Sequence, residues 1–343
     1  MKNKNYIFYI VAVMLPMLAS CRKELCYNHF AAVGLSLSWE QEWERDYGMS
    51  HKSNWNDGAY GMSYDALRPS MPEWVTLIRY SDKVDPEETS VSIYGGEFPV
   101  NPSVRQSYLL YNGDTEYIII SDMASLNDAR ATSTSRSRSS LDVMEKQYPG
   151  VRTANPPDML YSAFIENVPK AETHKVTPVP AKMQPLVYTY VVRYEFEYGL
   201  HHVALARGAI GGLAESVYLR NGVTGDQEAI LLYDCDLKNY GCEAHVRSFG
   251  IPGFPDTYYG RADGEAALQH KFTLNLEVML TSGNMLEFNY DISDQIAKQP
   301  RGGVITVSGI RIEDEQNAVP SGFDVEISGW GEHEDIDLPV GSD

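Results

Sequence analysis

The sequence predicts an all-β protein with two tandem antiparallel β-sandwich domains. Most of its readable segments alternate apolar and polar residues with a period of two, which places the apolar side chains on one face of a strand. Helical patterns are few and short, and strands do not alternate with helices as they do in a parallel sheet. Strands with one buried and one solvated face are typical of antiparallel sandwiches.

The strongest alternation predicts strands along the whole chain. In chain order these segments are VGLSLSW (33–39), LVYTYVVRYEFEY (186–198), KFTLNLEVML (271–280), GVITVSGIRI (303–312) and GFDVEISGW (322–330). Two segments, SWEQEWERDYG (38–48) and SLDVMEKQY (140–148), are each long enough for a helical turn or two. A third, GGLAESVYL (211–219), fits either a short helix or a bulged strand.

The N-terminal segment predicts secretion and lipidation. Lys2 and Lys4 precede an apolar run from residue 6 to 18, which is shorter than the roughly 20 residues that a membrane-spanning helix needs. The run ends in Leu-Ala-Ser-Cys at residues 18–21, which has the form of a bacterial lipobox. We therefore expect a signal peptide over residues 1–20, acylation of Cys21 with palmitate or a similar chain, and a lipidated tether over residues 21–29. An ordinary signal peptide followed by a chance cysteine is the alternative.

The net charge limits the classes of partner, and the prolines suggest where the first domain ends. A formal net charge of −19 excludes a nucleic-acid role, because phosphate binding needs a basic face. Pro178, Pro180 and Pro185 interrupt the chain just before the tyrosine-rich strand, so this stretch suits a sheet edge or a linker. The predicted domains are residues 30–181 and 182–343.

The cysteines suggest one disulfide. Cys235 and Cys242 flank the polar turn DLKNYG, and in an oxidising compartment a hairpin disulfide would close this short loop. Two free thiols are the alternative. Cys26 lies close to the predicted anchor, and its pairing stays open.

Three further stretches are candidate surface features. Residues 127–140, NDARATSTSRSRSS, predict a flexible surface loop, with an exposed protease site or a contact for an acidic neighbour as the functional alternative. Residues 251–264, IPGFPDTYYGRADG, predict an ordered loop in which Phe254, Tyr258 and Tyr259 could form a recognition surface. The stretch NWNDGAYGMSYDALRP, with Trp55 and Tyr60, is a weaker candidate of the same kind.

Signatures of catalysis and metal binding are missing from the sequence. It contains no G-x-S-x-G, H-E-x-x-H, P-loop or paired C-x-x-C motif, so we expect neither an enzyme nor a bound cofactor. His201 and His202 are adjacent, and in a strand they would point to opposite faces and could not chelate one metal. The Asp234–Asp236–Asn239 pattern lacks the glycine and glutamate of a calcium loop and predicts a turn. Glu195 and Glu197 predict a solvated strand face.

The chain resembles the fimbrillin-like lipoproteins of Gram-negative anaerobes. The resemblance rests on ELCYNHF and VGLSLSWEQEWERDYG after the lipobox, and on LLYNGDTEYIII, PPDMLYSAFIENV, RYEFEYGLHHVALARGAIGGLAESVYL and HVRSFGI in the same order. It implies two transthyretin-like sandwiches and a role in type V pili or related adhesion, where one subunit supplies a strand to another.

Two functions follow as expectations from the sequence. The first is a non-enzymatic outer-membrane lipoprotein at the cell surface, acting as an anchor or accessory subunit beside pilin-like partners, with the periplasmic face as the alternative location. The tether Arg22-Lys23-Glu24 lacks the acidic cluster of many surface-exported lipoproteins. The second is a surface lipoprotein that binds glycans through the loop containing Phe254 and Tyr258. The last alternating segment, 323–343, could complete its own domain or be donated to a neighbour.

Overall fold

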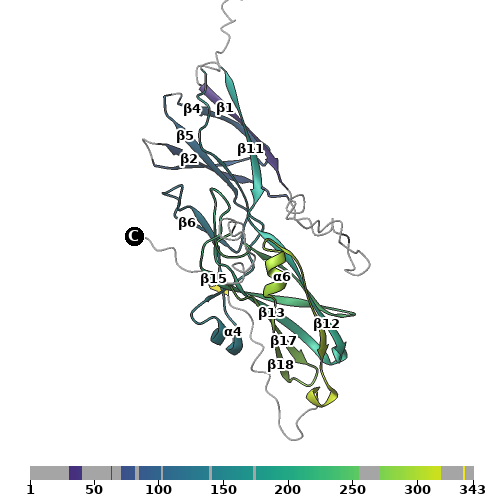
Figure 1. The fold of residues 1–343 in the computed structure, drawn as a ribbon. Coiled ribbons are helices and arrows are strands. Elements are labelled where there is room, and N and C mark those ends of the chain that lie inside the picture. The colour runs from purple at the N-terminus through teal and green to yellow at the C-terminus, as the bar shows by residue number, and fades with distance from the viewer. Residues whose placement is uncertain are drawn as a thin grey trace, which may run out of the picture.

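Two all-β units follow one another along the chain (Figure 1). The computed structural model describes residues 31–40, 63, 71–81, 85–101, 103–138, 141–172, 175–254, 270–317 and 335–336. Cys21, Cys26, Trp55, Tyr60, Tyr258 and Tyr259 lie outside this range, as does most of the last alternating segment. None of the helices in the described part of the chain has the length and apolarity needed to span a bilayer.

The first sheet has seven strands. Their order is β3 (Glu87–Val91), β2 (Val75–Ser81), β5 (Gln106–Asn112), β10 (Tyr161–Ile165), β11 (Val176–Pro185), β1 (Ala31–Trp39) and β4 (Gly95–Val100). β10 and β11 pair only at Tyr161–Pro185 and Ser162–Gln184, so the strands on either side diverge into two layers. A three-stranded sheet packs against the same core and consists of β14 (Ser216–Tyr218), β7 (Arg130–Ser133) and β6 (Ile118–Ser121).

The second sheet repeats this plan. Its order is β18 (Met285–Asp291), β17 (Thr273–Leu280), β13 (Val203–Ala214), β15 (Glu228–Lys238), β16 (Gly241–Ser248), β12 (Tyr188–Tyr198) and β19 (Gly303–Arg311). β15 and β16 stay paired only from Asp236–Glu243 to Lys238–Gly241, and then separate into two layers around a second core. The predicted all-β fold with tandem sandwiches is confirmed, although several strand pairs, among them β1–β11 and β12–β19, are parallel rather than antiparallel.

The period-two pattern places the core as predicted. Tyr190, Val192 and Tyr194 of β12 are completely buried, and Leu274, Leu276 and Val278 of β17 face them across the second core. Each fully buried side chain of this size contributes about 1.5–3 kcal/mol of hydrophobic free energy. The buried face of β12 ends near its last residue, since Tyr198 is 38% exposed.

A hydrogen-bonded tyrosine pair lies inside the second core. The hydroxyls of Tyr194 and Tyr233 are 2.8 Å apart, and Tyr194 donates to the carbonyl of Asn275. The ring of Tyr233 occupies the space opposite Gly208, where a Cβ would come within 2.4 Å of the ring. The pair therefore depends on the missing side chain at Gly208, and an alanine there would overpack the core.

The proline-rich stretch is a strand rather than a linker. β11 pairs with β1 in one continuous register that includes Gly34–Pro178 and Ser36–Pro180. We infer that both prolines turn their ring nitrogens away from β1, toward the flank that β10 leaves uncovered. The ladder of the first sheet ends at Pro185 and β12 begins at Tyr188, so the division after residue 181 stays a prediction.

The sequence predicts a flexible loop over residues 127–140, but residues 127–138 are ordered, and this prediction was wrong. The segment contains β7 and β8 (Ser135–Arg136), and it leads into helix α4 (Asp142–Gln147), which the sequence predicts. β8 pairs with β9 (Arg152–Ala154) and with β20 (Asp335–Ile336), and β9 pairs with β15. This crossover segment, residues 135–154, therefore covers the second sheet although it lies within the first predicted domain.

An apolar contact and a group of charges attach the crossover segment to the outer face of the second sheet. Leu141, Met144 and Tyr148 pack on Ala209, Ile230 and Leu232. Arg138, with a side chain only 1% exposed, reaches Glu277 at 3.1 Å, and Arg207 reaches the other carboxylate oxygen at 2.6 Å. Burial lowers the pKa of Arg138, while Glu277 opposes this shift. We call these three residues the buried ion triad.

The remaining short elements close loops of the second sheet. They are the 3₁₀ helix η3 (Leu200–His202), helix α6 (Ser293–Lys298) and the 3₁₀ helix η5 (Asp314–Asn317). Residues 211–219, for which the sequence left helix and bulged strand open, form the bulged end of β13 and the strand β14. The register shifts between Gly211 and Leu213, where Gly212 has a φ of 93°.

We predict that Arg138→Ala lowers the free energy of unfolding by about 3 kcal/mol, because it leaves part of the Glu277 charge unpaired in a buried site. Chemical denaturation followed by fluorescence measures this loss. Arg130→Ala is the matched control from the same stretch, since its ion pair with Asp122 is exposed and should contribute less than about 1 kcal/mol. Equal losses in the two variants would contradict the structural role of the triad.

Candidate functional site

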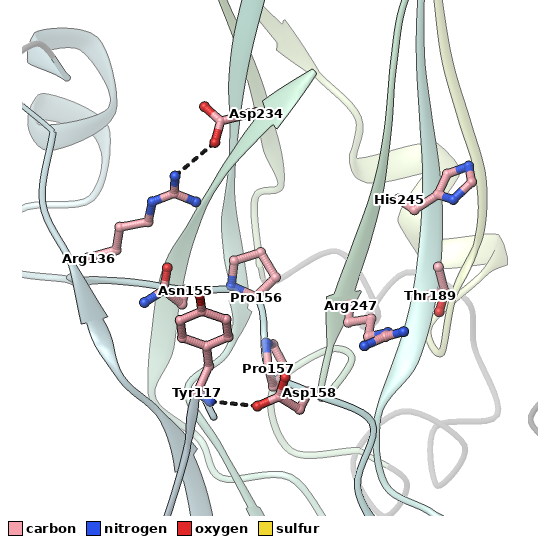
Figure 2. Close-up of a pocket in the computed structure, with 10 residues that line it drawn as sticks. All are labelled: Tyr117, Arg136, Asn155, Pro156, Pro157, Asp158, Thr189, Asp234, His245 and Arg247. Carbon is pink, nitrogen blue, oxygen red and sulfur yellow. Dashed lines mark hydrogen bonds and ion pairs between the residues drawn. The ribbon is translucent and has the colours of Figure 1, made fainter. Parts of the chain in front are cut away.

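A cavity of about 500 Å³ lies where the two sandwiches meet (Figure 2). Its lining combines residues that precede β6 and follow β9 with residues of β8, β12, β15 and β16. They are Tyr117, Arg136, Asn155, Pro156, Pro157, Asp158, Thr189, Asp234, His245 and Arg247. We call it the junction cavity.

The wall formed by the first unit is rigid because of its sequence, Asn155-Pro156-Pro157-Asp158. The two proline rings fix the backbone in an extended form. At one end the buried Asn155 donates to Thr134 Oγ1, and at the other end Asp158 accepts hydrogen bonds from the backbone N–H groups of Glu116 and Tyr117, the latter at 2.5 Å. The prolines therefore present a fixed apolar surface to the cavity.

The opposite wall belongs to the second sheet. His245 and Arg247 alternate along β16 with the buried Val246, so both face outward, and Arg247 is paired in register with Thr189 of β12. Figure 2 shows these three side chains on the far side of the two prolines from Arg136. Arg247 is half-buried and has no hydrogen bond or ion pair to any other residue that the structure describes.

The third side of the cavity carries a fixed charge pair. Arg136 donates to the carbonyl of Leu232 at 3.0 Å and to Asp234 at 2.9 Å. Its guanidinium is therefore held in place and its charge is already balanced, whereas that of Arg247 is not. A guanidinium beside apolar rings suits a ligand that has both an anionic group and a flat apolar face. The junction cavity is therefore a candidate binding site.

The predicted recognition loop is corrected at Phe254. Its side chain is only 3% exposed, its N–H donates to Thr224 Oγ1, and the guanidinium of Arg301 lies 4.1 Å above its ring. Phe254 belongs to the second core because the surrounding chain covers it, so it cannot contact a ligand. Tyr258 and Tyr259 lie outside the described residues and stay a prediction.

The predicted hairpin between Cys235 and Cys242 is present, but the disulfide is not. Both thiols are free. The register pairs Cys242 with Leu237, so Cys235 is a diagonal neighbour of Cys242 and not its direct partner. Burial raises the pKa of Cys242 to about 12 and raises that of Cys235 well above its ordinary value.

The two adjacent histidines are not in a strand. His201 and His202 lie in η3, and their ring centroids are 3.9 Å apart, so the expectation that they point to opposite faces was wrong. His202 Nε2 lies 2.8 Å from Asp314 Oδ1, and this contact lowers the pKa of Asp314. Glu195 accepts a hydrogen bond from Ser308, and Glu197 pairs with Arg311 at 3.1 Å, in keeping with a solvated face.

Sequence reasoning missed the junction cavity. The Asn-Pro-Pro-Asp stretch was a visible signal of a rigid segment, but its position against β16 depends on the crossover segment. His245 and Arg247 stand on the polar face of an ordinary amphipathic strand, where the sequence pattern does not distinguish them from other exposed charges.

Comparisons with known proteins agree with the fold. Residues 69–234 match the family described as a domain of unknown function, DUF5119. No curated protein sequence matches the chain at a significant level.

Three solved structures are similar. A protein described as an adhesin candidate from Bacteroides ovatus superposes with a TM-score of 0.53 at 19% identity, over 85% of this chain and 96% of that chain. The fimbrial anchor protein Mfa2 from Porphyromonas gingivalis gives 0.45 at 11% identity, over 81% and 90%. Candidate polysaccharide-binding proteins from Bacteroides thetaiotaomicron give 0.44 at 10% identity, over 80% and 90%. The chain therefore has the fold of the Bacteroides ovatus protein, as the resemblance implied.

We predict that the free energy of unfolding falls as the pH rises from about 9 to about 12, the window set by the ordinary pKa of a cysteine and that of buried Cys242. In this window the unfolded chain releases a thiol proton that the folded chain retains, so stability present below pH 9 is lost. Urea unfolding at a series of pH values measures the slope.

Cys242→Ala should flatten the slope. Its remainder comes from Cys235 and from Tyr194 and Tyr233, since burial also raises the pKa of both tyrosines. An unchanged slope in the variant, together with rapid alkylation of native Cys242 at pH 8, would contradict this assignment.

Proposed function

We propose that this chain is a non-enzymatic envelope protein of the adhesion or fimbrial type, lipid-anchored through Cys21, that associates with other β-rich subunits through an open sheet edge. The shared fold with the adhesin candidate from Bacteroides ovatus supports the general role. The anchor rests on the lipobox at residues 18–21, and attachment of an acyl chain would hold the protein at the outer membrane without spanning it.

The observation that carries the proposal is the edge formed by β18. Its seven residues pair with β17 in an unbroken register from Thr273–Asp291 to Met279–Met285, and its other flank pairs with no strand that the structure describes. Leu286, Phe288 and Tyr290 pack against the second core, so one face of the strand is attached to the sandwich. A regular, uncovered edge of this kind can accept a strand from a neighbour by β-augmentation.

The other terminal strands of the two large sheets carry features that hinder strand addition. β4 contains Pro99, which lacks a backbone donor, and β3 has only five residues and begins with the exposed Glu87 and Glu88. β19 has Gly309 at a φ of 80°, and its register with β12 shifts twice. Among the terminal strands of these two sheets, β18 is the least protected.

Binding of an acidic glycan in the junction cavity is a second candidate function. Phe254 is buried, so we place the glycan site in the junction cavity rather than at the loop that contains Phe254. In this cavity Arg247 has no partner among the described residues, and Pro156 and Pro157 offer a flat apolar wall. A uronic acid has the matching chemistry, with one carboxylate and an apolar ring face.

We predict that a photo-crosslinking amino acid at Met285 captures a neighbouring β-rich subunit in intact cells, because Met285 is exposed on β18. Extraction in mild detergent and mass spectrometry would identify the cross-linked peptide as an alternating strand. The control site is Tyr94, which is 79% exposed but lies in the turn between β3 and β4. Strand exchange at β18 would be overturned if neither site gave a cross-linked product, or if both sites gave the same products.

We predict that Arg247→Ala weakens binding of an oligouronate about tenfold or more, since hydrogen bonds to a charged group contribute about 1.5–3 kcal/mol. Titration calorimetry with the uronate and with its neutral analogue measures the difference. Arg105→Ala is the control, because Arg105 donates to Asn167 on another part of the surface. Equal binding by wild type and Arg247→Ala, or no binding by either, would remove this candidate.

A further inference from the structure

The end of β12 and the end of β19 form a rigid corner in the second unit. Gly199 has a φ of 86°, and its Cα lies so close to Ile312 that a Cβ would be 2.1 Å from the carbonyl oxygen. The N–H of Ile312 donates to Tyr198 at 3.0 Å, which ties the two strand ends together. This corner places η3 directly against η5.

Two further hydrogen bonds connect η3 and η5 to the loop between β17 and β18. The N–H of Thr281 donates to the carbonyl of His202 at 2.8 Å, and Asn284 Nδ2 donates to the carbonyl of Gln316 at 2.9 Å. The two 3₁₀ helices therefore have a common support. Side chains that they present to each other are held at a fixed separation.

Three metal-ligating side chains meet at this corner. His202 Nε2 lies 2.8 Å from Asp314 Oδ1, and one ligand atom from each of His201, His202 and Asp314 lies within 4.8 Å of the other two. The hydroxyl of Tyr198 donates to the same carboxylate oxygen at 2.9 Å, which orients Asp314. Such a supporting contact to a ligating carboxylate is usual around metal ions.

We propose that His201, His202 and Asp314 form a binding site for a divalent transition metal such as Zn²⁺. Zinc takes imidazole nitrogen and carboxylate oxygen at about 2.0–2.2 Å, so ligand atoms around one ion are about 3 Å apart. His202 and Asp314 already have this separation. A ligand nitrogen of His201 lies within 4.8 Å of both atoms, and because this side chain is exposed its ring is free of packing that would prevent rotation toward the third position.

Local charge favours a cation at this corner. Arg311 lies between Glu197 and Glu313, at 3.1 Å from each, and these two carboxylates together with Asp314 outnumber the single guanidinium by two negative charges. Two imidazoles in a set of three ligands favour zinc, copper or nickel over calcium and magnesium, which prefer oxygen alone. Three protein ligands leave a fourth position open toward solvent.

The test is calorimetric titration of the folded protein with ZnCl₂, repeated with MgCl₂. We expect one Zn²⁺ per chain, a higher melting temperature with zinc, and no binding of Mg²⁺. His201→Ala and Asp314→Asn should each weaken zinc binding at least tenfold. His201 and Asp314 are both exposed, so neither substitution should impair folding, which circular dichroism verifies.

The matched control is His270→Ala. His270 Nδ1 lies 2.7 Å from Glu228 Oε1, so this pair has one imidazole and one carboxylate but lacks the second histidine. Zinc binding should be unchanged in this variant. The proposal is overturned if wild type binds no Zn²⁺ below about 1 mM, or if His201→Ala and Asp314→Asn bind zinc as tightly as wild type.

Discussion

The buried ion triad determines how the two sandwiches are joined. Glu277 on β17 and Arg207 on β13 face each other across the outer face of the second sheet, and Arg138 completes the group from the crossover segment. Charges removed from water must be paired, so the chain between β7 and α4 cannot leave this face without leaving part of the Glu277 charge unpaired. The position of Arg138 brings α4 onto its apolar contact with Ala209, Ile230 and Leu232. It also fixes β8, from which Arg136 reaches into the junction cavity.

The three candidate surfaces lie on separate parts of this framework. The junction cavity lies at the seam, where a rigid proline wall from one unit meets the polar face of β16 from the other. The open edge of β18 is on the far strand of the second sheet, and the corner with His201, His202 and Asp314 is where β12 and β19 end. The residues that form the three surfaces do not overlap. A protein with the role that we propose would in this way combine attachment to a neighbouring subunit with recognition of a small ligand or a metal ion.

Local patterns in the sequence predict the strands well and the contacts between distant segments poorly. Alternation identifies β1, β12 and β17 and their buried faces, since burial of one face depends only on the period of the strand. The burial of Arg138 could not be predicted, because its partner is 139 positions away and a serine- and arginine-rich stretch is usually solvated. The disulfide was expected from the length of the loop alone. The strand register, which the sequence does not reveal, pairs Cys242 with Leu237 instead of Cys235. The sequence pattern places the adjacent histidines at the end of a strand, whereas the strand ends before Gly199 and the histidines lie in the 3₁₀ helix that follows. Phe254 lies in a loop whose composition is typical of recognition loops, but its side chain is buried like that of a core residue.

The parallel pairing of β1 with β11 has a mechanical consequence. β1 begins at the same end of the ladder as β11, with Ala32 beside Val176, while the far end of β11 leads through Pro185 into the second unit. A tension applied at the start of β1 and resisted at the second unit therefore pulls the two strands past each other along their length. All the hydrogen bonds of the ladder share such a shear load at once, whereas strands peeled from one end break their bonds one at a time. A protein held at its N-terminus and loaded through its second unit would thus carry force along its strongest direction.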